Sequence, residues 1–522
     1  MLDSLTPFQC LIERLKNPAL YNHPADAITV LETHISVVLL AGDYAYKLKK
    51  PYNLGFLDFT TLAARRHFCE EELRLNRRLA PELYLGVIPI HGSIDAPNFD
   101  NTGEVIEHAV KMRRFPQEAL LSNVLLRNAL QPSQLDALAQ RIAAFHGALP
   151  GATPAQPYGT PDHIDAAAHQ NFSQIEPLLS ALEDRAQLAR LAQITDTLFA
   201  ATTPIFLQRK HAGFVRECHG DLHLGNMALI DGEIVPFDCI EFNDDFRWID
   251  VMSEIAFVVM DLASRGHPDL GFRFLNTYLE HTGDFAGLKV LRYYLMYRAM
   301  VRAKIAAFRA TASETPPDSR APAWQAYRNY LALMEQFSRI PPPLLILMHG
   351  VSGSGKSTIA RDIAAHLPAI HVRSDVERKR LFGLAPLARS HSAPGTGIYG
   401  AEATQRTYAR LAEIARDTLA AGYAVILDAT FLGARQRALC QTLSGNTWIV
   451  SCDAPVAILR ARVTARYQTG TDAAEANLAI LEQQLTSRET LTAAETQGAI
   501  FIDTTQPFDP RALAAQLYRG VS

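Results

Sequence analysis

The sequence predicts a two-domain protein of mixed class, in which an α+β first half precedes an α/β half built on a doubly wound parallel sheet. A chain of 522 residues, 48% of them hydrophobic, is too long to form one core. Beyond residue 344, short apolar strands alternate with helical patterns, which is typical of a parallel sheet covered by helices. Three prolines, Pro341 to Pro343, form a stiff break directly before the first of these strands.

The composition narrows the class of protein further. The formal net charge is -4, so no global attraction to nucleic acid or to an anionic membrane is expected. The six cysteines are scattered and form no C-x-x-C pair, as expected for reduced thiols in the cytosol. The apolar run at residues 255–260 is far too short to span a bilayer. We therefore expect a cytosolic protein without a membrane partner.

The first domain begins with a predicted β-hairpin and a helix. Residues 35–40 and 44–49 have strand character and flank a tight turn at Gly42. An amphipathic pattern over residues 62–79 predicts the helix that follows. These elements bring strand and helix side chains together near the start of the chain.

Charged side chains on this hairpin and helix suggest a phosphate site. A strand lysine paired with a glutamate of the next helix is how kinases hold the α- and β-phosphates of ATP. The second strand carries Lys47 and Lys49 on one face, and the helix carries Glu71 and Glu72. From these residues alone, either lysine and either glutamate can form the pair.

The segment from His219 to Asn226 has the spacing H-x-D-x-x-x-x-N, which is that of the kinase catalytic loop. In this spacing Asp221 accepts or orients the proton of the substrate hydroxyl, and Asn226 binds Mg²⁺. A turn at residues 231–233 and a short strand lead to Asp238, which is placed to bind the same metal. A base, two metal ligands and a lysine supply most of what phosphoryl transfer needs.

This loop departs from the protein-kinase pattern. Gly220 stands where protein kinases have arginine, Cys239-Ile240 replaces Phe-Gly, and no A-P-E triplet follows, so no peptide-substrate platform is expected. With these features, residues 1–338 resemble the aminoglycoside phosphotransferase and choline kinase-like family of small-molecule kinases. The resemblance implies a kinase-like two-lobed fold that uses ATP and Mg²⁺, with the site residues Lys47, Glu72, Asp221, Asn226 and Asp238. It also implies that Asp250 braces the catalytic loop by hydrogen bonding.

The end of the first domain is marked twice. Residues 311–322 form a turn-rich loop, and a predicted helix around residues 324–337 lies between this loop and the proline break. We therefore predict a first domain over residues 1–338, a linker over residues 339–343 and a second domain over residues 344–522.

Residues 350–358 fit the phosphate-binding motif G-x-x-x-x-G-K-[ST], between a buried strand and an amphipathic helix. The glycines let backbone N–H groups point at phosphate oxygens, beside the positive end of the helix. Lys356 is expected to reach the outer phosphates, and the Ser357 hydroxyl is expected to bind Mg²⁺. The predicted nucleotide-binding residues are Gly350, Ser352, Gly353, Ser354, Gly355, Lys356, Ser357 and Thr358.

Three polar clusters follow the later strands, at the ends where doubly wound sheets bind ligands. Asp375 is a candidate base for an acceptor hydroxyl, and Arg378 is a candidate anchor for an anionic acceptor. Asp428 ends an apolar strand, as a Walker B carboxylate does, and is expected to act on the metal through water. Arg462 and Arg466 are candidates for a lid over the phosphates.

The residue after Asp428 helps to decide whether the second domain hydrolyses ATP or transfers its phosphoryl group. Motor and AAA-type ATPases place a water-activating glutamate there, and this chain has Ala429, which favours transfer to a hydroxyl. Residues 344–522 resemble the P-loop kinase family that includes polynucleotide kinase, gluconate kinase and chloramphenicol phosphotransferase, and S-D-x-x-R-K at residues 374–379 is similar to its acceptor site. As a whole, the chain resembles bacterial proteins in which an aminoglycoside phosphotransferase-like domain is fused to an AAA-type ATP-binding domain.

The predicted function is transfer of the γ-phosphoryl group of ATP to hydroxyls at two separate Mg²⁺ sites. The first acceptor is expected to be a small molecule. The second is a small molecule or, through the basic cluster at residues 373–389, a polynucleotide end. Cationic drugs call for an acidic pocket, for which Glu241, Asp244 and Asp245 are candidates. The sequence makes no prediction of the oligomeric state.

Two alternatives remain at this point. The first domain can be a degenerate kinase that binds a ligand and regulates the second, because no glycine-rich G-x-G-x-x-G loop is visible. The second domain can be an ATPase switch, although Ala429 opposes hydrolysis.

Overall fold

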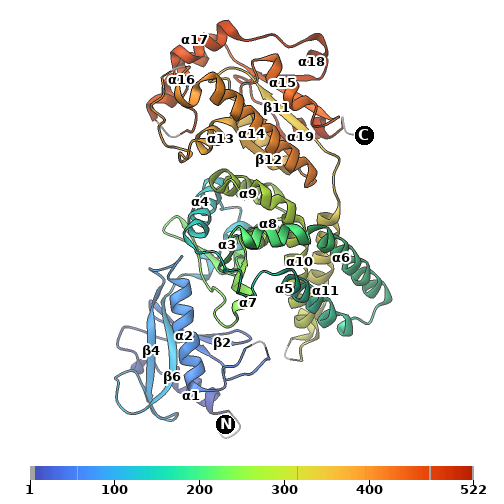
Figure 1. Cartoon of the computed structure of the whole chain (residues 1–522). Coiled ribbons are helices and arrows are strands. Elements are labelled where there is room, and N and C mark those ends of the chain that lie inside the picture. The colour runs from blue at the N-terminus through green and yellow to red at the C-terminus, as the bar shows by residue number, and fades with distance from the viewer. Residues whose placement is uncertain (1–5, 56, 314, 394, 470–471, 520–522) are drawn as a thin grey trace. The chain divides into compact units, whose positions relative to one another are not determined.

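The computed structural model describes residues 6–55, 57–313, 315–393, 395–469 and 472–519 (Figure 1). The chain divides into two compact units. The first unit comprises Met1–Leu138, Ala144–His163 and Gln208–Val258, and the second comprises Ala139–Ala143, Ile164–Leu207 and Val259–Ser522. The linker predicted at residues 339–343 falls inside the second unit, and the predicted domain limits stay a prediction.

The first unit contains an antiparallel sheet of six strands in the order β1-β2-β3-β6-β4-β5. The strands are β1 (Ile28–Glu32), β2 (Ser36–Ala41), β3 (Tyr44–Lys49), β4 (Tyr84–Gly92), β5 (Pro97–Asn98) and β6 (Val105–Arg113). The hairpin of β2 and β3 is the one predicted from the sequence, and Gly42 turns it with a φ of 54°. A Cβ at Gly42 would lie 2.2 Å from the carbonyl oxygen of Pro24, so the turn requires glycine.

Helix α1 (Pro7–Leu15) precedes this sheet along the chain, and helix α2 (Leu62–Asn76) packs against β4 and β6. The Thr61 hydroxyl caps α2 by accepting a hydrogen bond from the N–H of Ala64 at 3.1 Å. The helix ends at Asn76, a little before the predicted residue 79, and its Glu72 side chain is fully buried.

Two short antiparallel pairs frame the predicted catalytic loop. Strand β7 (Val215–Glu217) pairs with β10 (Trp248–Asp250), and β8 (Met227–Ile230) pairs with β9 (Glu233–Pro236). The loop connects β7 to β8, and Asp238 lies just beyond β9, so both arrive at one end of the same hairpin. The helices in this part of the chain are α3 (Leu121–Leu126), α4 (Pro132–Ala148), α5 (Pro161–Ile175), α6 (Leu182–His211), α7 (Asp244–Arg247) and α8 (Val251–Ser264).

In the second unit, a group of helices precedes a parallel sheet along the chain. The helices are α9 (Pro268–Thr282), α10 (Leu288–Thr311) and α11 (Pro317–Ser338), of which α10 and α11 pack against each other. The sheet has the order β12-β13-β11-β14-β15, with every neighbouring pair parallel. Its strands are β11 (Leu345–His349), β12 (Ala369–Arg373), β13 (Ala424–Asp428), β14 (Thr447–Asp453) and β15 (Ala499–Asp503). The predicted doubly wound sheet is confirmed.

Helices alternate with these strands along the chain. They are α12 (Lys356–His366), α13 (Ser374–Leu381), α14 (Ala401–Ala420), α15 (Ala434–Gln441), α16 (Val456–Thr469), α17 (Leu478–Ser487), α18 (Ala493–Gln497) and α19 (Pro510–Arg519). Side chains of α12 and α19 share one buried apolar cluster with Ile346, Met348 and Val450 of the sheet. This burial fixes the start of α12, and with it the P-loop, at the carboxyl end of β11.

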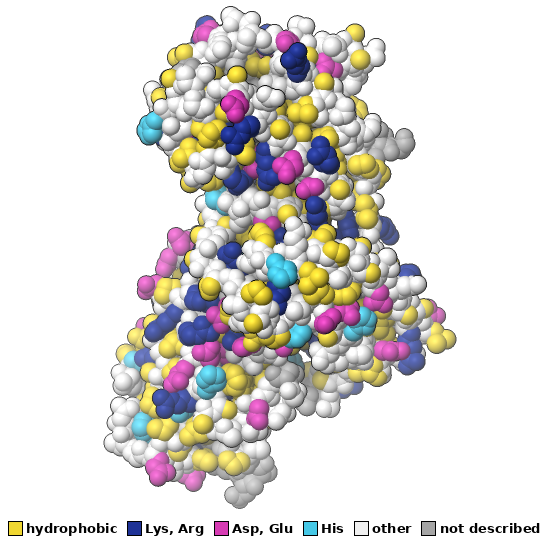
Figure 2. All heavy atoms as spheres, in the orientation of Figure 1, with side chains coloured by type: hydrophobic (Ala, Val, Ile, Leu, Met, Phe, Trp, Pro, Cys, Tyr) yellow, Lys and Arg dark blue, Asp and Glu magenta, His cyan; other side chains and the backbone are white. Residues whose placement is uncertain are grey.

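Within the described ranges, no helix is both long and apolar enough to cross a membrane. On the face drawn in Figure 2, basic and acidic side chains are interspersed. This distribution agrees with the small net charge of -4.

Candidate active sites

Both lysines of β3 share one buried carboxylate. The Lys47 Nζ lies 2.8 Å from Oε1 of Glu72, and the Lys49 Nζ lies 2.7 Å from Oε2 of the same residue. Lys47 also forms an ion pair with Asp238, and Lys49 forms one with Glu241. The five charged groups therefore alternate in sign along a single row.

Within this row, opposite charges offset the cost of burial for Glu72 and Lys47. Burial opposes the charge of Glu72, but Lys47 and Lys49 outweigh it and lower the pKa of that carboxyl to about 2. Burial likewise opposes the charge of Lys47, but the carboxylates of Asp238 and Glu72 hold its pKa well above the ordinary value. A buried pair that lost one member would leave the other uncompensated.

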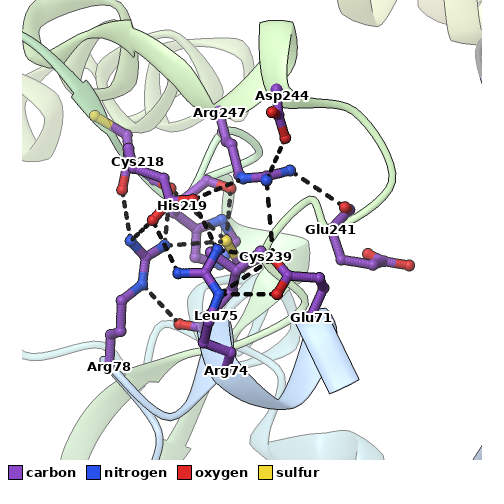
Figure 3. Close-up of polar contacts among 12 residues, drawn as sticks. Glu71, Arg74, Leu75, Arg78, Cys218, His219, Cys239, Glu241, Asp244 and Arg247 are labelled. Atoms are coloured by element: carbon purple, nitrogen blue, oxygen red, sulfur yellow. Dashed lines mark hydrogen bonds and ion pairs between the residues drawn. The ribbon is translucent and has the colours of Figure 1, made fainter. Parts of the chain in front are cut away.

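The geometry separates the candidates for the phosphate pair, for which the sequence allowed either lysine and either glutamate. Lys47 contacts Asp238, the expected metal ligand, whereas Lys49 contacts the buried Glu241. Glu71 instead pairs at 2.8 Å with Arg74 of its own helix (Figure 3). The arrangement favours Lys47 with Glu72 as the phosphate pair, and this assignment stays a prediction.

The predicted catalytic loop brings its polar residues together. The side-chain amide of Asn226 donates to Oδ2 of Asp221 at 2.8 Å and to the Asp221 carbonyl at 3.0 Å. The backbone N–H of Phe237 donates to the Asn226 carbonyl at 2.9 Å, which holds the neighbouring Asp238 at this end of the hairpin. The side chain of Asp221 is 34% exposed, so an acceptor hydroxyl can approach it. Carboxylate and amide oxygens are the donors that Mg²⁺ prefers.

The brace of this loop is Glu254, not Asp250 as the resemblance implied. The Glu254 carboxylate accepts the backbone N–H of Gly220 at 2.8 Å and that of His219 at 3.2 Å. Asp250 instead pairs with Arg209 at 2.6 and 2.8 Å. Nothing in the sequence distinguishes Glu254 from Asp250 as the brace, because both acids lie on one apolar stretch and their partners are far away along the chain.

Glu254 also meets the Nε2 of His146 at 3.0 Å, and with Cys218 these two side chains form a buried group whose potential ligand atoms lie within 4.8 Å of one another. Both oxygens of Glu254 already accept backbone hydrogen bonds, and burial raises the pKa of the Cys218 thiol well above its usual value. The group is therefore suited to holding the loop and not to binding a metal.

Arginines of helix α2 and of the residues just after it form hydrogen bonds with strand β7, which leads into the catalytic loop (Figure 3). Arg74 and Arg78 both donate to the carboxylate of Glu217, and Arg78 donates also to the carbonyl of Cys218 at 3.1 Å. Arg247 reaches the same Glu217 carboxylate at 3.2 Å. These contacts hold the helix of Glu72 at a fixed distance from the loop of Asp221.

The acidic residues suggested for a cationic drug are all engaged. Glu241 is buried with Lys49, and Asp244 pairs with Arg247. Asp245 lies 3.5 Å from the Nδ1 of His163. These three carboxylates do not form an open acidic pocket.

In the second unit, the P-loop has the backbone that its glycines permit. Gly350, Gly353 and Gly355 all have positive φ, at 139°, 81° and 86°. A Cβ at Gly350 would lie 2.3 Å from the carbonyl oxygen of Cys452. Lys356 is buried and donates to the Val351 carbonyl at 2.9 Å, and burial lowers its pKa against the opposing charge of Asp428.

Asp428 lies beside this loop, because β13 pairs in parallel with β11 and places Asp428 opposite Met348. The Nε2 of His371 lies 3.2 Å from its Oδ2. Burial would raise the pKa of Asp428, but His371 and the neighbouring cations lower it well below the ordinary value. His371 was missed by the sequence analysis, since a histidine within a buried strand carries no motif.

Asp375 and Arg378 occupy the first turns of α13. Burial raises the pKa of Asp375, opposed by the charges of Arg378 and Arg373, and a raised pKa makes a carboxylate a stronger base. Arg378 donates to the Ile398 carbonyl at 2.8 Å and to the Thr404 hydroxyl at 3.1 Å, so this guanidinium holds the following loop.

The two arginines of α16 differ in their surroundings. Arg462 donates to the carbonyl of Gly353 at 3.4 Å and to the hydroxyl of Thr504 at 2.8 Å. Arg466 donates to the Ala476 carbonyl at 3.5 Å, while its buried Nε has no partner among the described residues. Arg466 thus has an unused donor among the described residues, and its role at the phosphates stays a prediction, whereas Arg462 holds the P-loop to the segment after β15.

A side chain of α17 accepts a hydrogen bond from one backbone N–H of the P-loop. The backbone N–H of Ser352 donates to Oε1 of Gln484 at 2.8 Å. This N–H is one of those expected to bind phosphate, and in this structure the Gln484 amide accepts its hydrogen bond instead. The sequence analysis did not anticipate this contact.

Two family models match the chain. A model described as "Phosphotransferase enzyme family" matches residues 60–294, and one described as "AAA domain" matches residues 345–491. A protein of Mycobacterium tuberculosis strain H37Rv, described as uncharacterized, is 31% identical over 450 residues, which cover 85% of this chain and 88% of that protein. The chain belongs to the same family as this mycobacterial protein.

The chain is a phosphotransferase that joins an aminoglycoside phosphotransferase-like domain to a P-loop, AAA-type domain. Kinase families of this kind use ATP with a divalent metal. Among solved structures, a choline/ethanolamine kinase family protein from Mesorhizobium loti is 14% identical, with a TM-score of 0.38, covering 63% of this chain and 96% of that one. A sugar kinase from Janibacter sp. HTCC2649 is 22% identical, with a TM-score of 0.28, covering 35% of this chain and 96% of that one.

Proposed function

We propose that the chain is a double phosphotransferase, with one MgATP site in residues 1–338 and a second in residues 344–522. Each site transfers the γ-phosphoryl group of ATP to a hydroxyl. The observation that carries the proposal is the contact of Lys47 with both Glu72 and Asp238, which supports a joint site for phosphate and metal.

At the first site, Lys47 holds the α- and β-phosphates and Glu72 orients it. Asn226 and Asp238 bind Mg²⁺ through oxygen atoms, and Asp221 orients the acceptor hydroxyl and takes its proton. The acceptor is a small molecule, because the loop lacks the features that bind a peptide. Since Glu241, Asp244 and Asp245 are engaged by other side chains, an acceptor of high positive charge is not favoured.

At the second site, the P-loop and Lys356 hold the triphosphate, and Ser357 binds Mg²⁺ with support from Asp428. Asp375 is the base, consistent with its raised pKa, and Arg466 neutralises charge that develops on the phosphates. Ala429 supports transfer over hydrolysis. The acceptor is a hydroxylated small molecule, and a polynucleotide end is an outcome of the test.

We also place the protein in the cytosol. The described structure leaves all six cysteines unbonded to one another, which supports a reducing compartment.

Purified protein incubated with γ-labelled ATP and a panel of hydroxylated metabolites, antibiotics and 5′-hydroxyl oligonucleotides tests the proposal. We expect label in two acceptors, one lost with Asp221→Asn and the other with Lys356→Ala. Label transfer that either single variant abolishes completely contradicts two independent sites. Binding of MgATP at the first site without transfer to any acceptor supports a regulatory domain instead.

A further inference from the structure

Lys49 is buried more deeply than a phosphate-binding lysine needs to be. Its side chain is 1% exposed, between Glu72 at 0% and Glu241 at 4%, and its Nζ lies 5.2 Å from the centre of the Phe59 ring. Lys47, at 11%, occupies the end of the row that carries the half-exposed Asp238. Lys49 therefore lies toward the buried end of the row, between two buried carboxylates.

The ion pairs of this row have to rearrange when a magnesium-bound nucleotide binds. Lys47 now pairs with Asp238, but the proposed function needs Lys47 on the phosphates and Asp238 on the metal. Their mutual ion pair must open, because both groups acquire new partners. During this exchange Glu72 keeps Lys49 on its second oxygen at 2.7 Å, so it stays charged and in place.

Lys49 also fixes the segment that follows Asp238. Its ammonium pairs with the Glu241 carboxylate, and Arg247 donates to the Glu241 carbonyl at 3.2 Å (Figure 3). The segment is thus held by one side-chain contact and one main-chain contact, from two different elements. Neither contact involves Lys47, so the segment stays in register when Lys47 moves.

We propose that Lys49 is a positioning residue for the first phosphotransferase site: it holds Glu72 and Glu241 while Lys47 and Asp238 exchange their ion pair for phosphate and metal. This inference rests on the proposed function of that site. Lys49 does not touch the nucleotide itself, and it acts through the two carboxylates that it joins.

The test measures MgATP binding by calorimetry in the full chain carrying Lys356→Ala, which disables the P-loop site. Lys49→Met leaves Glu241 buried without its counter-ion, so we expect a lower Tm and roughly tenfold weaker MgATP binding. The double variant Lys49→Met/Glu241→Gln removes that unpaired charge. We expect its Tm to recover while its MgATP binding stays weak, because the two carboxylates are no longer joined.

Recovery of both Tm and affinity in the double variant overturns the inference, since Lys49 then serves stability alone. Unchanged affinity in Lys49→Met overturns it as well. If Lys49→Met does not fold, the double variant alone decides. Lys50→Met is the matched control, because Lys50 pairs with the exposed Glu32 and lies outside the row.

Lys47→Met and Asp238→Asn, in the same background, separate the inference from the function on which it rests. Loss of MgATP binding in both, with normal binding in the Lys49 variants, rejects the positioning role and keeps the site. Normal binding in Lys47→Met and Asp238→Asn rejects the proposed site itself.

Discussion

The carboxylate of Glu254 accepts the backbone N–H of Gly220 at 2.8 Å, which ties helix α8 to the loop of Asp221. Its other oxygen accepts the N–H of His219 at 3.2 Å. Gly220 has a φ of 89°, and a Cβ there would lie 2.6 Å from the Phe246 carbonyl oxygen. The backbone of the loop therefore requires glycine at this position. The carboxylate stays charged, because its hydrogen bonds and His146 outweigh burial and lower the pKa of Glu254.

Replacing this brace should damage the first site without touching the reacting atoms. Glu254→Gln presents an NH₂ group to one backbone N–H, and we expect a loss of about 2 to 4 kcal/mol in the free energy of unfolding. Urea denaturation measures it. Exposed Glu183→Gln serves as the control and should stay within about 0.5 kcal/mol of the wild type. Equal stability of Glu254→Gln and wild type contradicts the brace.

Asp221→Asn should separate chemistry from binding at the first site. The amide cannot take the proton of the acceptor, so the transfer rate should fall by about 10² to 10⁴. Asn226 and Asp238 remain to bind the metal, so MgATP affinity should change little. Transfer assays and calorimetry on one preparation check both expectations. A variant that transfers phosphate at the wild-type rate shows that Asp221 is not the base.

Gln484→Ala should strengthen nucleotide binding at the P-loop. The Ser352 N–H then has no protein acceptor to give up, and removing a competing hydrogen bond of about 1 kcal/mol predicts roughly fivefold tighter ATP binding. The measurement uses the Asp238→Asn background, so that only this site responds. Gln483→Ala, at the adjacent exposed position, is the control. Weaker binding in Gln484→Ala would show that the amide assists the nucleotide instead.

Acid should destabilise the protein partly through His349. Burial, together with nearby cations such as Arg437, lowers the pKa of His349 from 6.5 to about 4, and its Nε2 is buried without a partner in the described structure. Between pH 6.5 and about 4, His349 is protonated in the unfolded chain but neutral in the folded one. The free energy of unfolding therefore falls as the pH drops through this range. At pH 5 the loss is about 1 to 2 kcal/mol, after allowance for solvent screening.

Thermal unfolding at pH 7.5, 6 and 5 checks this. His349→Gln cannot titrate and should lose less stability than the wild type between pH 7.5 and pH 5. Parallel pH curves for the two proteins would assign the acid sensitivity to other groups.

The features that the sequence predicted are those encoded within a few residues. The P-loop glycines, the spacing from His219 to Asn226 and the turn at Gly42 each carry their own backbone requirement, so they could be recognised without the fold. The alternation of strands and helices beyond residue 344 could also be predicted, because buried strands are short apolar runs between helices.

The features that were missed are contacts between residues far apart in the chain. Glu254 reaches Gly220 from 34 positions away, and Lys49 reaches Glu241 from 192. Gln484 reaches Ser352 from 132 positions away. A lone acid or amide carries no local pattern that names its partner, so these contacts depend on the packing of whole elements. The brace implied at Asp250 was misplaced for the same reason, because the contact of Glu254 with Gly220 has no local pattern.

The number of MgATP molecules bound per chain tests the central claim most directly. Isothermal titration should give two for the wild type, one for Lys356→Ala, one for Asp238→Asn and none when both changes are combined. A wild-type stoichiometry of one, or a single change that removes all binding, would contradict the claim that this chain carries two separate sites.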